Sequence, residues 1–377
     1  MKIIGGERKG GALILRNIAA VAATAVAVAC FAVRLAPQAM AQKETAALAA
    51  AGFIMPDGAA QVLRTGFDSE HETEEQQETG EAPGVLSEPE NSRQPGSKAS
   101  SSGQAPASSA PAASGAGQKI EELQIGNAGV QYQNVYVRNS NKNHSVDIKA
   151  ELQKQPAVKI KTDGSPQVLI YHTHTTEAFL TKELSAYPKD GQTRSRDNSR
   201  NVVMVGNAVE AQLRAAGIGV VHDLTVHDYP AYNGSYNRSA QTIAKNLQKY
   251  PGIQVTLDIH RDAMTTSAGV RLKPTVKVNG KKAAQIMILS GCDDDGTLGF
   301  PNWEYNLRLA VRFQKSLSDL FPGLARPLNF GPTKYNGNLT KGSLLVEVGT
   351  EVSTLDEAIY SGELLGKAIV KSLLALK

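Results

Sequence analysis

The chain has 377 residues, a length typical of one or two domains with appended segments. Its net charge of +4 is unevenly spread, because Asp68–Glu90 holds nine acidic residues and no lysine or arginine. The rest of the chain is therefore basic, which suits an anionic membrane, an anionic wall polymer or nucleic acid. Cys30 lies inside an apolar segment and Cys292 lies far downstream, so an intramolecular disulfide is not expected and a C-x-x-C zinc knuckle is absent.

The first 41 residues have the pattern of a membrane anchor or an export signal. Lys2, Arg8 and Lys9 precede Ile18–Val33, which is uncharged and mostly apolar. Basic residues before such a run predict a cytoplasmic N-terminus and an exported remainder, which argues against nucleic acid as a partner. Ala39–Ala41 resembles a cleavage site, but we favour a retained single-pass anchor in the cell membrane. The domain that follows then lies on the outer side of the membrane.

Residues 42–118 are predicted to form a largely disordered linker. Asp68–Gln118 is first rich in glutamate and then, over Ala99–Gly117, in serine, alanine, glycine and proline. It has too few large apolar residues to form a core. We expect this linker to give the next domain reach beyond the membrane. That domain is expected at 119–377, with its core at 167–377.

From Gln167 onward, apolar strands alternate with amphipathic helices. This alternation predicts an α/β fold with a mainly parallel central sheet and helices on both faces. Asn279-Gly280 predicts a hairpin turn, and Thr354 with Glu357 predicts a capping box for the last helix. The predicted strands cover 168–171, 218–221, 253–259, 273–278, 281–289 and 343–348, and the predicted helices cover 201–216, 235–250, 302–320 and 354–376.

The stretch Gln167–Phe179, QVLIYHTHTTEAF, joins a buried strand to residues that bind metals. His172, His174 and Glu177 follow the strand, at the point where open α/β sheets place their chemistry. Imidazole nitrogen and carboxylate oxygen both suit zinc. Strand alternation places the two histidines on the same face, so the pattern does not choose between them.

Later strands end in polar residues that we expect at the same edge of a mainly parallel sheet. The strand in QVTLDIHRDA ends in His260, and the strand in SLLVEVGTE carries Glu347. His174, Glu177 and His260 form a His₂Glu set with an open fourth position, which is the stoichiometry of catalytic zinc. Glu347 is the expected general base and acid, unless it is the buried ion-pair partner of a cation.

Other polar residues near these strand ends are secondary candidates. Asp197 is an alternative carboxylate ligand for the metal. Asp258 shares a strand face with His260 and can orient its ring. Arg261 is a candidate for binding a substrate carboxylate. Asp293–Asp295 follow the strand in QIMILSGCDDD and are expected at the same sheet edge. They lack the spacing of an EF-hand, so we expect an exposed turn there.

Four ordered motifs carry a family likeness: YHTHTTEAF, RDNSRNVVMVGN, DIHRDA and LLVEVGTEVSTLDEA. Together they resemble the stage II sporulation protein P family from Gln167 to the C-terminus. This resemblance implies a cell-wall hydrolase related to zinc N-acetylmuramoyl-L-alanine amidases, with endopeptidase activity on cross-linked stem peptides. It also implies action on septal peptidoglycan during forespore engulfment, together with stage II sporulation proteins D and M.

The resemblance also implies roles for individual residues. His174, either Glu177 or Asp197, and His260 would bind zinc, and Glu347 would be catalytic.

Ser353 departs from the family pattern, which usually has asparagine there, so a substrate contact by that asparagine is not carried over. Two other functions stay open on the residues alone. One is a non-catalytic wall-binding or assembly subunit on a degenerate hydrolase fold. The other is a zinc carboxypeptidase or endopeptidase, because the same ligand set suits peptide cleavage.

Overall fold

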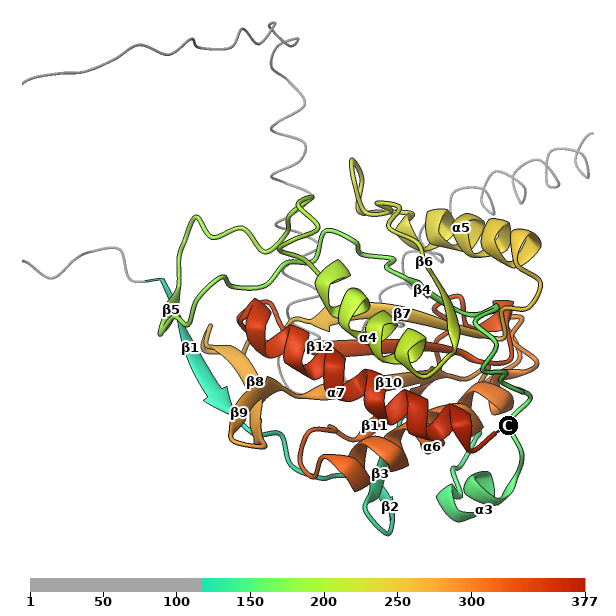
Figure 1. Ribbon diagram of the computed structural model, residues 1–377. Helices are drawn as coiled ribbons and strands as arrows, with labels where there is room; N and C mark the ends of the chain where they lie inside the picture. Colours follow the sequence, from blue (N-terminus) through green and yellow to red (C-terminus); the bar gives the residue numbers. More distant parts are fainter. Residues whose placement is uncertain (1–116, 377) are drawn as a thin grey trace, which may run out of the picture. The chain divides into compact units, whose positions relative to one another are not determined.

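The computed structural model describes residues 117–376, which are drawn in colour in Figure 1. The predicted membrane segment at 1–41, and the predicted linker as far as residue 116, lie outside the described residues. Within residues 117–376, no helix is both long and apolar enough to cross a bilayer. The proposed division of the chain into segments therefore stays a prediction.

An eight-stranded sheet forms the centre of the described domain, in the order β2-β3-β11-β10-β12-β7-β4-β6. Its strands are β2 (Val130–Tyr132), β3 (Val135–Asn139), β4 (Pro166–Tyr171), β6 (Gly219–His222), β7 (Val255–Asp262), β10 (Ile286–Gly291), β11 (Leu328–Gly331) and β12 (Ser343–Thr350). Strands β12, β7, β4 and β6 run parallel to one another. Strands β4 and β7 are buried along nearly their whole length, as is usual where helices cover both faces of a parallel sheet.

A second sheet of four strands has the order β5-β1-β8-β9. Its strands are β1 (Gln118–Leu123), β5 (Ala186–Tyr187), β8 (Arg271–Val278) and β9 (Lys281–Ala284). Asn279 and Gly280 have positive φ values of 50° and 79°, which confirms the hairpin turn between β8 and β9. The predicted strand 281–289 divides at Gln285, whose side chain exchanges hydrogen bonds with the backbone of Ile125.

The central sheet is mixed, so the prediction of a mainly parallel sheet is wrong. Strand β10 runs antiparallel to β12, and β2 runs antiparallel to β3. Parallel neighbours need a crossover connection, but the hairpin β8–β9 returns the chain directly into β10. The end of β10 therefore points away from the ends of β4, β7 and β12. Asp293–Asp295, which follow β10, lie at the opposite edge from the one predicted.

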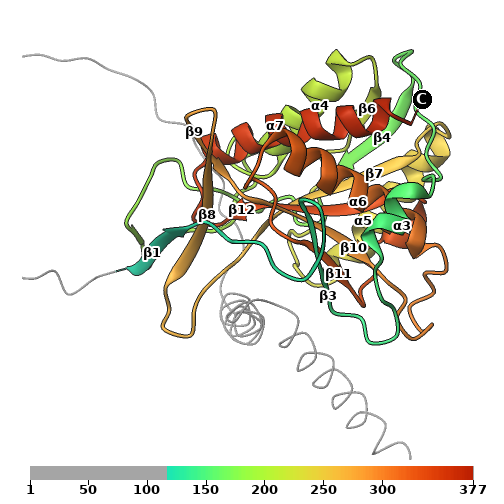
Figure 2. The ribbon, with the colours of Figure 1, turned by 90° about the horizontal axis from the view of Figure 1, so that it is seen from below.

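Helices cover both faces of the central sheet, as predicted. Alternate residues of β4 show the two layers, because Val168 and Ile170 belong to the large core, while Leu169 and Tyr171 pack with Ile243 of α5. Helices α4, α6 and α7 supply the large core, and Figure 2 shows α4 beside α7. The helices are α3 (Ile148–Gln153), α4 (Val203–Ala215), α5 (Ser235–Lys249), α6 (Trp303–Leu320) and α7 (Leu355–Leu374), with a short 3₁₀ helix, η1, at Gly337–Leu339.

Candidate active site

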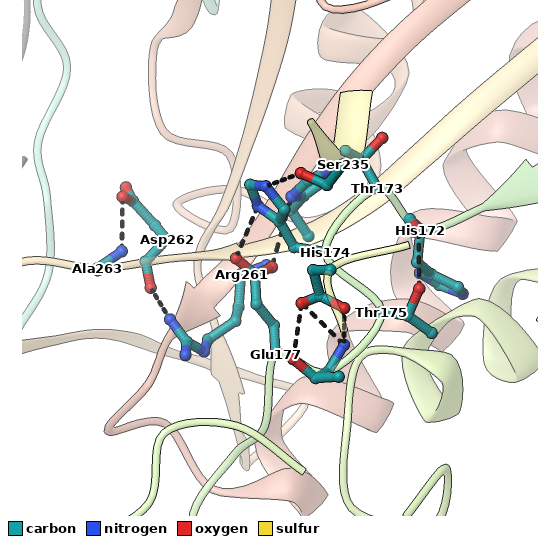
Figure 3. Close-up of polar contacts among 12 residues, drawn as sticks. His172, Thr173, His174, Thr175, Glu177, Ser235, Arg261, Asp262 and Ala263 are labelled. Atoms are coloured by element: carbon teal, nitrogen blue, oxygen red, sulfur yellow. Dashed lines mark hydrogen bonds and ion pairs between the residues drawn. The ribbon is translucent and has the colours of Figure 1, made fainter. Parts of the chain in front are cut away.

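A tight turn after β4 sends neighbouring side chains in different directions. Strand β4 ends at Tyr171, and residues 173–176 form turns in which Glu177 N donates to His174 O at 3.1 Å. Strand alternation therefore stops before His174, and the expectation that both histidines share one face is wrong. In Figure 3, His172 and His174 lie on different sides of the turn.

His174 joins Glu177 and His260 in a buried cluster. One nitrogen or oxygen atom from each lies within 4.8 Å of the others, and the residues are only 8%, 5% and 2% exposed. His174 Nδ1 lies 3.4 Å from Glu177 Oε1, and His260 Nδ1 lies 3.4 Å from Glu177 Oε2. The structure thus brings together the His₂Glu set that the strand ends predict.

The spacing within the cluster is close to that of metal ligands. Ligands about 2.0–2.2 Å from zinc are roughly 3.3–3.6 Å apart at tetrahedral corners, and each histidine nitrogen lies 3.4 Å from one of the two Glu177 oxygens. His174 Nε2 lies 3.1 Å from Ser235 Oγ, and His260 Nε2 lies 2.8 Å from Asp258 Oδ1. Partners of this kind fix the ring orientation of histidines that bind metals. The donor set and its supports therefore fit a zinc ion.

The charges around His260 favour a cation. Thr173 N and Oγ1 donate to the two oxygens of Asp258 at 2.8 and 2.6 Å, which fixes this carboxylate beside the ring. Burial lowers the pKa of His260, but Asp258 and Glu177 outweigh it and raise that pKa well above the ordinary value. Burial likewise raises the pKa of Glu177, yet its contacts with both histidines hold the pKa well below its usual range. The two carboxylates thus stabilise positive charge between them.

Glu347 lies beside this cluster, because β12 pairs with β7 so that Glu347 is opposite His260. Glu347 Oε2 is buried and has no hydrogen-bond partner among residues 117–376. Burial, followed by the charge of Asp262, raises the pKa of Glu347 to about 8. The neighbouring Arg326 pairs instead with Asp262 at 2.8 Å, which argues against Glu347 as a structural ion-pair partner. An unpaired carboxyl group beside the cluster is suited to proton transfer.

His172 is not part of the cluster. Its Nδ1 lies 2.8 Å from Ile259 O, and its Nε2 lies 2.9 Å from Nε2 of His222. Burial, with the nearby His222, lowers the pKa of His172 to about 3, which keeps the ring neutral. The structure therefore assigns to His172 a contact between β4, β6 and β7, rather than the metal contact predicted as an option.

Two further candidates contribute no side chain to the cluster, although Arg261 N donates to Glu177 Oε2 at 3.1 Å. Asp197 is exposed, and its Oδ1 accepts hydrogen bonds from the backbone and hydroxyl groups of Ser199. Arg261 is 6% exposed, and its guanidinium donates to Ala178 O and Thr193 O at 3.0 and 2.7 Å. These contacts join the guanidinium of Arg261 to the loops around the site, and binding of a substrate carboxylate by Arg261 stays a prediction.

Aromatic residues that were not predicted from the sequence surround His174. The Tyr232 ring stacks on the His174 ring with centroids 4.5 Å apart, and Tyr236 meets its edge at 5.6 Å. Tyr335 contacts Tyr236 at 5.5 Å. The detectable signal is HDYPAYNGSYNRS at residues 227–239, which runs from the loop after β6 into the start of α5 and contains three tyrosines.

The model of the family described as stage II sporulation protein P matches residues 67–370. The chain belongs to the stage II sporulation protein P family. This membership confirms the resemblance seen in the four motifs. The family member from Bacillus subtilis (strain 168) is 28% identical over 218 residues, which are 54% of this chain and 50% of that protein. The match thus spans about half the length of this curated relative.

Similar solved structures include the N-acetylmuramoyl-L-alanine amidase AmiC2 of Nostoc punctiforme. It is 14% identical, with 56% of this chain and 97% of that chain covered and a TM-score of 0.32. Another is the CwlD amidase from Clostridioides difficile, whose structure was solved in complex with the GerS lipoprotein. It is 13% identical, with 56% and 98% covered and a TM-score of 0.33. Similarity at this level does not establish a shared activity.

Proposed function

We propose that this family member is a zinc-dependent hydrolase of septal peptidoglycan that acts during forespore engulfment. Its main reaction is that of an N-acetylmuramoyl-L-alanine amidase, which cleaves the bond between the lactyl group and L-alanine. The observation that carries the proposal is the buried His174–Glu177–His260 cluster with Glu347 opposite His260 on the next strand. Membership of a sporulation family supports the biological setting, and the family resemblance supports peptidoglycan as the substrate.

His174, Glu177 and His260 would hold the zinc ion, while Asp258 and Ser235 orient the two rings. A zinc ion held there would supply Lewis-acid chemistry: it would polarise the scissile carbonyl and lower the pKa of a water to about 7. The aromatic contact with Tyr232 keeps the His174 ring in place.

Glu347 moves the proton in this proposal. Its carboxylate takes a proton from the attacking water and then gives it to the nitrogen of the leaving amine. Nitrogen leaves as a neutral amine, and the new carboxyl group stays on the lactyl side. Its pKa is raised toward neutral pH, where a carboxyl group can both accept and return a proton.

Endopeptidase activity on cross-linked stem peptides is the second candidate function. A His₂Glu zinc site with a nearby glutamate serves peptide hydrolysis as well as amide hydrolysis. The buried, unpartnered Glu347 Oε2 argues against a non-catalytic wall-binding subunit, because a degenerate site has no need of an unpaired carboxyl group.

The proposed cellular location and partners rest on the N-terminal sequence and on the family resemblance. The apolar run Ile18–Val33 after Lys2, Arg8 and Lys9 supports a single-pass protein of the cell membrane with its hydrolase on the outer, septal side. The family resemblance supports stage II sporulation proteins D and M as partners. Nucleic acid is not a proposed partner.

Mass spectrometry of muropeptides tests the proposed reaction. Purified peptidoglycan is digested with the full chain, with and without a chelator, and the released fragments are weighed. We expect free stem peptides that begin with L-alanine, and their loss when the chelator is present. Cleaved cross-links, with the stem peptides still attached to the glycan, would favour endopeptidase activity. Peptidoglycan left undigested would contradict the proposal that the protein is a hydrolase.

A further inference from the structure

A second group of metal-binding side chains lies at the opposite edge of the central sheet. Strands β3, β10 and β11 run parallel, and their carboxyl ends lie at this edge. His144 follows β3, and Cys292 and Asp294 follow β10. One nitrogen, sulfur or oxygen atom from each of these three residues lies within 4.8 Å of the others.

Backbone hydrogen bonds hold the two segments of this group together. The two carboxylate oxygens of Asp294 accept from Lys142 N and Asn143 N, each at 2.9 Å. The side chain of Asn143 donates in return to Asp294 O at 2.9 Å. Each carboxylate oxygen has a second lone pair, so these bonds orient Asp294 without excluding a metal contact.

His144 and Cys292 complete the group from either side. Asn139 Nδ2 donates to His144 O at 2.7 Å, which fixes the backbone of the histidine. No hydrogen bond reaches either ring nitrogen of His144 within residues 117–376, although the ring contacts Trp303 at 4.8 Å. Cys292 is fully buried and is a free thiol in the described domain. Both the imidazole and the thiol are therefore available to a ligand.

Carboxylates gather around the thiol. Asp294 belongs to the group itself, and Asp293 is next to Cys292 in the chain. Their negative charge lowers the energy of a bound cation, which would replace the thiol proton.

We propose that His144, Cys292 and Asp294 bind a divalent metal ion of the zinc class, independently of the candidate active site. Thiolate, imidazole and carboxylate are all zinc ligands, and a water completes four-coordination. Binding releases the Cys292 proton to solvent and ties the loop after β3 to the end of β10. The ion lies at the sheet edge away from the ends of β4, β7 and β12, so its role is to hold this loop and not to serve the candidate active site.

Cobalt(II) is a direct probe of this site, because the candidate active site contains no sulfur. The test uses the full chain carrying Cys30→Ala, in which Cys292 is the last thiol. After metal removal, cobalt titration should produce a thiolate-to-cobalt charge-transfer band, which saturates by two equivalents because the candidate active site also takes up cobalt. It should also quench the single tryptophan, Trp303, which contacts His144.

Matched variants separate this site from the first. Cys292→Ser and His144→Gln should each lose most of the charge-transfer band and the Trp303 quenching, whereas His260→Ala should keep both. His144 is half-exposed, so His144→Gln tests the proposal even where Cys292→Ser impairs folding. The absence of the band in the Cys30→Ala protein would overturn the proposal. So would a full-strength band in folded His144→Gln protein. Neither outcome depends on hydrolase activity.

Discussion

Glu347 has a buried side-chain oxygen, Oε2, without a hydrogen-bond partner among residues 117–376. Glutamine at this position keeps the size of the side chain but cannot accept the proton. We expect Glu347→Gln to keep its zinc and its fold and to release muropeptides on the order of 10²–10⁴ times more slowly. Glu121→Gln on exposed β1 is the matched control and should remain active. Near-parental turnover by Glu347→Gln protein would rule out proton transfer by this residue.

Glu347 also makes the stability of the metal-free protein depend on pH. Its pKa in the fold is about 8, above the ordinary value of 4.5, so the folded state binds the extra proton between these values. The contribution of the neutral Glu347 carboxyl group to folding stability is fully present below the pKa of the unfolded chain. It is lost as pH rises through the pKa of the folded state. Metal-free Glu347→Gln protein avoids this loss. Its melting temperature relative to the parent should therefore rise between about pH 5 and about pH 8. A difference that does not change with pH, measured by calorimetry, would contradict this account.

Asp258 is expected to act on the metal through His260. Its carboxylate lies 2.8 Å from His260 Nε2, so Asp258→Asn should weaken the orientation of the ring. We expect zinc affinity to fall by roughly 10–100-fold, with most turnover recovered at saturating zinc. Competition with a coloured chelator measures the affinity, and Asp163→Asn, in an exposed turn, is the control. If the Asp258→Asn and Asp163→Asn proteins bind zinc with equal affinity, Asp258 has no role in zinc binding.

Single residues at strand ends were the predictable part of the site. His260 and Glu347 each interrupt an apolar run, which marks the point where a buried strand meets its edge. The choice between His172 and His174 was not predictable, because it depends on turns that begin at residue 173. Tyr335 was not predictable either, since only the fold brings it beside Tyr236.

At the scale of elements, helices and hairpins were predicted better than strand directions. The helices followed from local periodicity and caps, and the Asn279-Gly280 turn followed from backbone preference. The direction of β10 depends instead on how the chain returns to a sheet assembled from distant segments. Apolar content carries no information on strand direction, so Asp293–Asp295 was expected at the wrong edge.

The capping box of α7 gives an element-scale prediction. Thr354 Oγ1 accepts from Glu357 N, and the Glu357 carboxylate accepts from Thr354 N, which confirms the predicted box. Thr354→Ala should lower the free energy of unfolding by about 1 kcal/mol, with zinc content unchanged. Denaturant titration measures the loss, and Thr354→Ser should recover most of it. A variant as stable as the parent would show that this cap contributes little.

At the scale of the whole described domain, the mixed sheet separates two clusters of metal-binding residues. The parallel strands β4 and β7 carry His174, Glu177 and His260 to one edge, and the reversed strand β10 carries Cys292 to the other. One ion would serve hydrolysis, and the other would hold a loop. The metal content per chain should therefore be measured in variants that each lack one of the two sites.

Zinc reconstitution tests the central claim most directly. The full chain is stripped of metal, shown to be zinc-free by elemental analysis, and assayed for muropeptide release before and after zinc is restored. We predict no release from the stripped protein, recovery with zinc, and no recovery in His260→Ala protein, which should hold one zinc fewer than the parent. Undiminished muropeptide release by protein proven to be zinc-free, or by His260→Ala protein, would contradict the account.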